Sequence, residues 1–176
     1  MKIPHREAGL PYTPKVGIVT VSSSRYEAML MGREYSDESG DLAERILRGS
    51  GIGMIHRFLI GDRPHQIGRV LEDAWRNGIE LLIFIGGTGV SSSDYTYKTL
   101  RAMIRDELIG FNDICNMLSF RDIGARAVSS RLIAGWYRDM LVFALPGSRH
   151  AVELILSEII IKEYQHLLWI RKYGRI

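Results

Sequence analysis

The chain has 176 residues, which is enough for one domain with a sizeable hydrophobic core. An apolar share of 46% and a charged share of 24% are ordinary for a globular protein, and no apolar run approaches the roughly 20 residues of a membrane span. A net charge of +3 with no clustered basic face argues against a nucleic-acid binder. The single cysteine, Cys115, excludes an internal disulfide and suits a reducing cytoplasm.

The N-terminal part of the chain is expected to hold an arm, a strand, a loop and a helix. Residues 1–14 contain three prolines and lack the apolar core of a signal peptide, so we predict a flexible or draped arm. The β-branched run 16–21 predicts a buried strand, and the polar, glycine-containing residues 25–40 are expected to form a loop. A helix is expected from about Asp41, because Asp41 and Glu44 have capping-box spacing.

The middle of the chain alternates strands with a helix. A second strand is expected at 54–60 and a third at 81–85. Between them, Pro64 suits the first turn of a helix, which Asn77 and Gly78 are expected to end. This alternation is typical of parallel strands joined by helices.

The C-terminal part begins with two stretches of helical apolar spacing, at 100–108 and 111–118. Cys115 lies on the second apolar face, so we predict a packed core thiol there. The last helix is apolar over much of its circumference and is therefore either deeply buried or shared with another subunit. Two further strands are expected at 132–136 and 140–145, joined by a polar turn. The long last helix is expected from about 148 onward.

These elements predict a single α/β domain at 15–176, built on a mostly parallel sheet with helices on both faces. Right-handed crossovers place the carboxyl ends of parallel strands along one edge, where ligands of such sheets bind. The segments that directly follow strands should converge at this edge: 22–24, 61–62, 86–94 and 146–148.

The apolar run 81–85 ends at Gly86, Gly87, Thr88 and Gly89. Glycines let backbone N–H groups approach an anion closely, so this loop is the leading candidate for a phosphate cradle. It lacks the Gly-Lys-Ser/Thr of a Walker loop and the last glycine of the dinucleotide fingerprint. The alternative is a tight strand-to-helix turn with no ligand.

Two aspartates follow strands at the same predicted edge. Asp62 and Asp94 are predicted to share a magnesium ion, a hard cation that prefers oxygen ligands and often bridges protein to phosphates. The alternatives are that Asp62 caps the helix at Pro64, that Asp94 belongs to a turn, and that Ser148 only caps the last helix. A metal with two anion cradles, the glycine loop and the start of the last helix, predicts phosphoryl or nucleotidyl transfer.

Several short motifs resemble the MoaB/MogA family of molybdenum cofactor biosynthesis proteins, which includes the G domain of gephyrin. No single motif is decisive, but their order and spacing are specific, and the resemblance runs from about Val16 to the start of the final helix. The chain looks more like MoaB than MogA at 117–120 and 143–148. The motifs are Thr20-Val21-Ser22, Asp37-Glu38-Ser39-Gly40, Gly86-Gly87-Thr88-Gly89 with Asp94 and Thr96, Gly110-Phe111, Met117-Leu118-Ser119-Phe120, Ser130-Arg131 with Ala134-Gly135, and Phe143-Ala144-Leu145-Pro146-Gly147-Ser148.

The resemblance implies an enzyme of molybdenum cofactor biosynthesis with the three-layer α/β/α molybdopterin-binding fold. Such an adenylyltransferase uses Mg²⁺ and ATP to adenylylate molybdopterin, releases pyrophosphate, and leaves its product to a downstream metal-insertion protein. It also implies homotrimers or hexamers. Asp62 and Asp94 match the family's catalytic, metal-binding aspartates. With the predicted convergence, the candidate substrate-binding residues are Ser22, Gly86, Gly87, Thr88, Gly89, Ser119, Pro146, Gly147 and Ser148.

The chain departs from the family pattern at three positions. The family usually has arginine where this chain has Ser93, proline where it has Tyr97, and aspartate where it has Ser23. Lys98 or Arg149 is the candidate replacement for the missing phosphate-facing arginine. The Ser93 departure supports an alternative function, that of a catalytically weak or inactive oligomeric molybdopterin-binding carrier.

Overall fold

The computed structural model, which describes residues 10–174, contains one five-stranded sheet in the order β2-β1-β3-β5-β4. Strand β1 pairs in parallel with β2 and β3, β3 pairs in parallel with β5, and only β4 runs antiparallel. The mostly parallel sheet predicted from the sequence is confirmed. The strands are β1 (Val16–Val21), β2 (Ile55–Ile60), β3 (Leu81–Ile85), β4 (Ile133–Tyr137) and β5 (Met140–Leu145).

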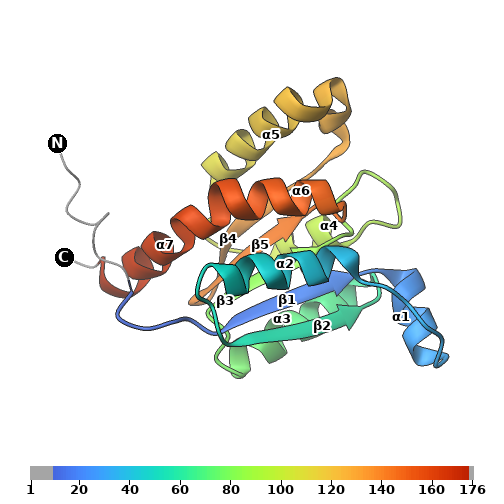
Figure 1. Ribbon diagram of the computed structural model, residues 1–176, viewed down its shortest axis with the longest axis horizontal. Helices are drawn as coiled ribbons and strands as arrows, with labels where there is room; N and C mark the ends of the chain where they lie inside the picture. The colour runs from blue at the N-terminus through green and yellow to red at the C-terminus, as the bar shows by residue number, and fades with distance from the viewer. Residues whose placement is uncertain (1–9, 175–176) are drawn as a thin grey trace.

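Helices cover both faces of this sheet and make the molecule a three-layer α/β/α sandwich (Figure 1). On the face toward the viewer lie α2 (Glu38–Gly49), α5 (Ile109–Ile123), α6 (Arg149–Ile155) and α7 (Ile161–Tyr173). On the other face lie α3 (Pro64–Arg76) and α4 (Thr96–Met103). Three further elements are α1 (Ser23–Leu30), the 3₁₀ helix η2 (Gly124–Ser129) and the π-helical turn η3 (Leu156–Ile160).

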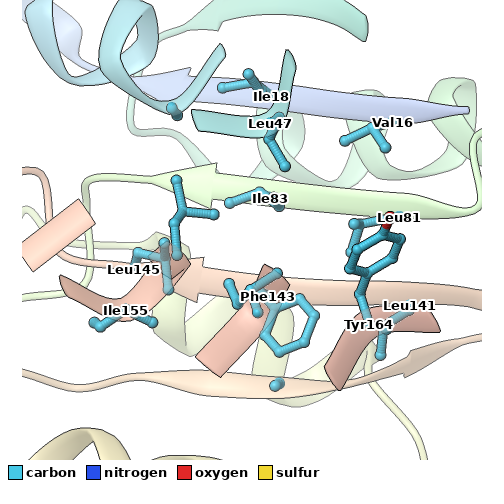
Figure 2. Packing of buried hydrophobic residues seen from close by; sticks show 14 of the residues in the cluster. Val16, Ile18, Leu47, Leu81, Ile83, Leu141, Phe143, Leu145, Ile155 and Tyr164 are labelled. Carbon is cyan, nitrogen blue, oxygen red and sulfur yellow. The ribbon is translucent and has the colours of Figure 1, made fainter. Parts of the chain in front are cut away.

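Alternating side chains of the strands feed the two halves of the core. Leu81 and Ile83 point to the α2 and α6 face, where they pack with Phe143 (Figure 2), while Leu82 and Phe84 point to the α3 face. Strands that are apolar at every position are buried on both sides, as expected of a parallel sheet covered by helices. Burial of this kind contributes about 25 cal/mol per Å² of apolar surface.

The prediction that a helix begins at about Asp41 with a capping box is wrong. Helix α2 begins at Glu38, and its N-cap is Asp37, whose Oδ1 accepts a hydrogen bond from the Gly40 N–H at 3.1 Å. The carboxylate of Asp37 therefore satisfies a free N–H of the first turn, and Asp41 lies inside the helix.

The prediction of a loop throughout 25–40 is also wrong. Residues 23–30 form α1, and the Ser22 Oγ caps it by accepting the Arg25 N–H at 3.4 Å. None of the side chains of α1 is buried. Apolar periodicity therefore could not reveal this helix, because it covers no core.

The final helical segment is buried rather than exposed along its apolar stripe. Val152, Ile155, Leu156, Ile160 and Tyr164 belong to the core that includes the sheet and α2. One π-helical turn, η3, interrupts the α-helical pattern between α6 and α7. The buried alternative predicted for this helix is thus the observed one.

The thiol of Cys115 is fully buried in the core, so the prediction of a packed cysteine is confirmed. Burial raises the pKa of Cys115 to about 12, which keeps the thiol protonated and unreactive near neutral pH. Within residues 10–174, no helix is long and apolar enough to cross a membrane.

Of the predicted N-terminal arm, residues 1–9 lie outside the described residues. The visible remainder lies against the body of the domain. Leu10 packs on the core, and the Tyr12 hydroxyl donates to Glu80 Oε1 at 2.6 Å.

Candidate active site

The loops that follow β1, β3 and β5 meet at the carboxyl edge of the sheet. The Gly86 N–H donates to the Leu145 carbonyl at 3.0 Å, and a Cβ on Gly147 would lie 3.5 Å from Gly86 Cα. A Cβ on Gly86 would lie 2.5 Å from the Val21 carbonyl oxygen, and Gly86 has φ +104°. Only glycine fits this position, because the backbone takes a left-handed conformation and a neighbouring strand approaches it closely.

The glycine loop presents a row of free hydrogen-bond donors. Gly87 has φ +67°, and its carbonyl accepts the Thr96 N–H at 3.0 Å, which closes the loop onto the start of α4. Among the hydrogen bonds formed by residues 10–174, none uses the backbone N–H of Gly87, Thr88, Gly89 or Val90. Successive unpaired N–H groups in such a turn form a concave site that attracts anions.

Asp62 lies under this loop and is held by groups from two other segments. Its side chain is only 8% exposed, and Oδ1 accepts hydrogen bonds from the Tyr95 N–H at 3.1 Å and the Thr96 Oγ1 at 3.3 Å. The Asp62 N–H donates to Ser23 Oγ at 3.2 Å. Helix α3 is preceded by Arg63 and has no side-chain cap, so the alternative in which Asp62 caps that helix is wrong.

Asp94 lies at the other end of the loop, in a turn of its own. Its Oδ2 accepts the Ser91 N–H at 3.0 Å, and its N–H donates to the Ser91 carbonyl at 3.2 Å. A Cβ on Gly89 would lie 2.6 Å from Asp94 Oδ2, so the carboxylate rests against the loop. Asp94 therefore does form the turn that was expected as its alternative role, and this turn places the Asp94 carboxylate against the glycine loop.

The electrostatics of the two aspartates favour a bound cation. Burial raises the pKa of Asp62, and the nearby charge of Asp94 raises it further, against the hydrogen bonds from Tyr95 and Thr96 that lower it. A Cβ on Gly87 would lie 2.5 Å from Asp62 Oδ2, so both carboxylates line the same loop.

The donor set fits Mg²⁺. Within residues 10–174 there is no cluster of three or more His, Cys, Asp or Glu side chains that would make an all-protein metal cage. Mg²⁺ commonly binds through one or two carboxylates and completes its shell with water and phosphate oxygens. Two carboxylates next to a loop of free N–H groups match that requirement.

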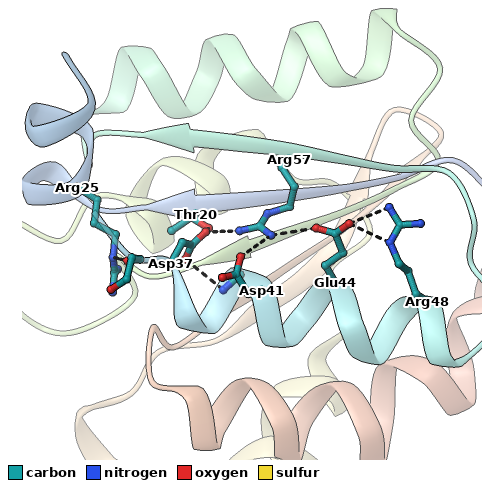
Figure 3. A network of polar contacts seen from close by, with 9 residues as sticks. Thr20, Arg25, Asp37, Asp41, Glu44, Arg48 and Arg57 are labelled. Atoms are coloured by element: carbon teal, nitrogen blue, oxygen red, sulfur yellow. Dashed lines mark hydrogen bonds and ion pairs between the residues drawn. The ribbon is translucent and has the colours of Figure 1, made fainter. Parts of the chain in front are cut away.

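The loop after β5 is tied to the start of α2, a contact that the sequence did not reveal. Ser39 Oγ donates to the Gly147 carbonyl at 2.8 Å. Asp37 in turn accepts from Thr20 Oγ1 at 2.6 Å and pairs with Arg57, which also contacts Asp41 and Glu44 (Figure 3). The N-terminus of α2, with its partial positive charge, is thereby fixed beside the Gly147 loop.

The remaining predicted substrate residues have different surroundings. Ser148 Oγ accepts the Ala151 N–H at 3.3 Å and caps α6, which is the role that the alternative prediction gave it. Pro146 directly precedes Gly147 in the same loop, and Ser22 caps α1 at the same edge. Ser119 lies on α5, and no hydrogen bond in the described part of the chain joins it to the glycine loop.

Of the two expected replacements for the family arginine, Lys98 lies at the loop, whereas Arg149 pairs with Glu38. Ser93 Oγ lies 2.9 Å from Ser91 Oγ, Lys98 Nζ donates to the Ser92 carbonyl at 3.4 Å, and Arg149 pairs with Glu38 at 3.2 Å. The guanidinium that contacts the glycine loop is that of Arg131, which donates to the carbonyls of Thr88 and Gly89. Arg131 belongs to the Ser130-Arg131 motif of the family resemblance, but no role was predicted for it from the sequence.

Comparison with known proteins found relatives that match most of the chain. The family model described as "Probable molybdopterin binding domain" matches residues 17–166. A "Probable molybdopterin adenylyltransferase" from Methanocaldococcus jannaschii is 35% identical over 88% of this chain and 91% of its own length. The chain belongs to the MoaB/MogA family.

Other members of the MoaB/MogA family match along nearly the whole length. The "Molybdenum cofactor biosynthesis protein B" of Halalkalibacterium halodurans is 33% identical over 96% of each chain. The crystal structure of the "tungsten cofactor synthesizing protein MoaB" from Pyrococcus furiosus superposes with a TM-score of 0.81 at 30% identity, covering 94% of this chain and 99% of that one. The fold implied by the family resemblance is confirmed.

Proposed function

We propose that this MoaB/MogA-family chain is a molybdopterin adenylyltransferase that uses Mg²⁺ and ATP and acts in molybdenum cofactor biosynthesis. The observation that carries the proposal is the buried Asp62, placed with Asp94 against a glycine loop in which four N–H donors form no hydrogen bond within residues 10–174. The M. jannaschii relative, named a probable molybdopterin adenylyltransferase, supports the same activity. The inactive-carrier alternative has no observation in its favour beyond Ser93.

The reaction needs positioning and charge neutralisation more than a protein nucleophile. A phosphate oxygen of molybdopterin forms a bond to the α-phosphorus of ATP, the bond from that phosphorus to the β-phosphate oxygen breaks, and pyrophosphate leaves. We assign the glycine-loop N–H groups and the starts of α2 and α6 to the phosphates. Asp62 and Asp94 would hold Mg²⁺, which neutralises developing negative charge when bound.

Incubation with molybdopterin, ATP and Mg²⁺ tests this proposal. The wild-type protein is expected to form adenylylated molybdopterin and pyrophosphate, and Asp94→Ala is expected to remain folded without turnover, because one of two carboxylates is lost. Asp73→Ala, at an exposed aspartate of α3, is the matched control and should keep full activity. A folded, active Asp94→Ala protein would remove the assigned role, and tight binding without product would favour the carrier.

We further propose a homotrimer or hexamer assembled through α5 and η2, acting in the cytoplasm and delivering its product to a metal-insertion protein. The apolar stripe of the last helix is mostly buried in the core, so the candidate contact surface lies elsewhere. Phe120 is 63% exposed and Val128 is 89% exposed, and both line a hollow of about 560 Å³. Apolar patches of this kind mark contact sites with other chains. The exposed apolar side chains of α5 and η2 are Ile109, Ile114, Met117, Phe120, Ile123 and Val128.

Light scattering after size-exclusion chromatography tests the assembly. The wild-type protein is expected to have three or six times the 20.0 kDa mass of one chain. Phe120→Asp should shift it toward the monomer, because a charge would be buried in the contact. Leu30→Asp, at an apolar residue of α1 that is 66% exposed, is the control and should leave the mass unchanged. A monomeric wild-type protein would contradict this assembly.

A further inference from the structure

Arg131 forms a clamp on the glycine loop through the carbonyl groups of Thr88 and Gly89. Its backbone N–H donates to the Thr88 carbonyl at 3.2 Å, and its Nε donates to the same carbonyl at 3.4 Å. Its Nη2 donates to the Gly89 carbonyl. Two successive carbonyls of the loop are therefore held by one residue that lies more than forty positions further along the chain.

This clamp decides where the loop directs its free donors. A trans peptide unit is planar, and its C=O and N–H groups point in opposite directions. The Thr88 and Gly89 carbonyls face Arg131, so the N–H groups of Gly89 and Val90 face away from it. Both belong to the four donors that form no hydrogen bond within residues 10–174.

The guanidinium is itself held by an aromatic ring. The Cζ of Arg131 lies 4.9 Å from the centre of the Tyr97 ring, and the Tyr97 hydroxyl accepts from Arg101 at 3.2 Å. Tyr97 directly follows Thr96, whose hydroxyl contacts Asp62. The ring thus connects the clamp with the start of α4, which positions the buried aspartate.

The charge of Arg131 is not cancelled locally, since no ion pair within residues 10–174 joins it to a carboxylate. A planar guanidinium with several donors suits two carbonyls and an aromatic face together, whereas a lysine ammonium does not reproduce that geometry. The positive charge of Arg131 also lies at the loop in which Ser93 stands where the family usually has an arginine.

We propose that Arg131 is a positioning residue of the phosphate-binding loop, and that Tyr97 holds its guanidinium in place. Arg131 orients the N–H donors of Gly89 and Val90 toward the polyphosphate of the nucleotide. This role rests on the proposed function for the identity of the ligand. It also makes Tyr97, which replaces the usual proline of the family, part of the loop's support.

Arg131→Met, Arg131→Lys, Tyr97→Leu and Tyr97→Phe test the clamp, with Arg171→Met as the matched control. Arg171 also lies over an aromatic ring, that of Trp136 at 5.0 Å, and donates to the Arg138 carbonyl at 2.7 Å. Two quantities are measured: the KM for Mg-ATP against kcat, and hydrogen exchange of the Tyr95 and Thr96 amides. These amides bond to Asp62 and to the Gly87 carbonyl.

Arg131→Met is expected to raise the KM for Mg-ATP about tenfold or more and to speed exchange of the two amides about fivefold. Arg131→Lys should recover part of both effects, Tyr97→Leu should show both more weakly, and Tyr97→Phe and Arg171→Met should resemble wild type. Unchanged exchange, an unchanged KM, or equal exchange effects in Arg171→Met would overturn the proposal. A wild-type protein that makes no product would contradict the proposed function but not the role of Arg131, because the hydrogen-exchange measurement needs no substrate.

Discussion

Replacement of Asp62 by asparagine is expected to lower kcat for adenylylation by about a hundred- to a thousandfold in a protein that remains folded. Asparagine keeps an oxygen for the Tyr95 N–H, so the variant removes the negative charge with little change of shape. Initial rates at saturating Mg-ATP measure the effect, with Asp73→Asn as the exposed control. A variant with wild-type kcat would show that the charge of Asp62 has no part in catalysis.

The same substitution is expected to raise the midpoint of thermal unfolding in metal-free buffer at pH 7. Burial, together with the charge of Asp94, raises the pKa of Asp62, so the folded state binds this proton more tightly than the unfolded state. The resulting stabilisation is complete below the ordinary aspartate pKa of 3.8 and is lost as pH rises through the folded-state pKa. The advantage of asparagine should therefore shrink as the pH falls to 3.8.

Differential scanning calorimetry with and without Mg²⁺ completes this test. Mg²⁺ should stabilise the wild-type protein, because a bound cation favours the ionised Asp62, and should have a smaller effect on Asp62→Asn. An asparagine variant that melts below wild type at pH 7 without metal would contradict the electrostatic interpretation of this site.

Replacement of Gly87 by alanine is expected to cost about 1–3 kcal/mol of folding free energy and to lower kcat/KM about a hundredfold or more. Gly87 has φ +67°, and a Cβ there would collide with Thr96 Oγ1 and lie 2.5 Å from Asp62 Oδ2. The loop can then close only by moving the buried aspartate. Denaturant unfolding and steady-state kinetics measure the two effects.

Gly32 provides a matched control for this substitution. Its φ of +66° is almost the same, but a Cβ there would meet nothing within 4 Å. Gly32→Ala should therefore show only the conformational cost of about 1–2 kcal/mol and keep full activity. Equal kinetic losses in both variants would mean that backbone strain, and not contact with Asp62, explains the result at Gly87.

Patterns that are local in the chain predicted most of the architecture. Apolar runs such as 81–85 predicted buried strands, and the strand–helix alternation predicted a parallel sheet with its loops at one edge. The glycine loop and the two aspartates were identifiable because they lie in segments, 61–62 and 86–94, that directly follow strands. The family motifs predicted the fold that the structure shows, but they assigned no role to Ser39 or Arg131.

The supports of the site depend on contacts between segments far apart in sequence. Ser39 reaches Gly147 across 108 positions, and Arg131 reaches Thr88 across 43. Hydrogen bonds of this kind leave no periodic trace, since a polar residue in a loop looks the same whether it faces water or a distant carbonyl. The helix at 23–30 was missed for a related reason, because it buries nothing. Local sequence patterns thus determined the sheet and the residues that follow its strands, whereas tertiary packing alone decided which distant side chains hold those residues in place.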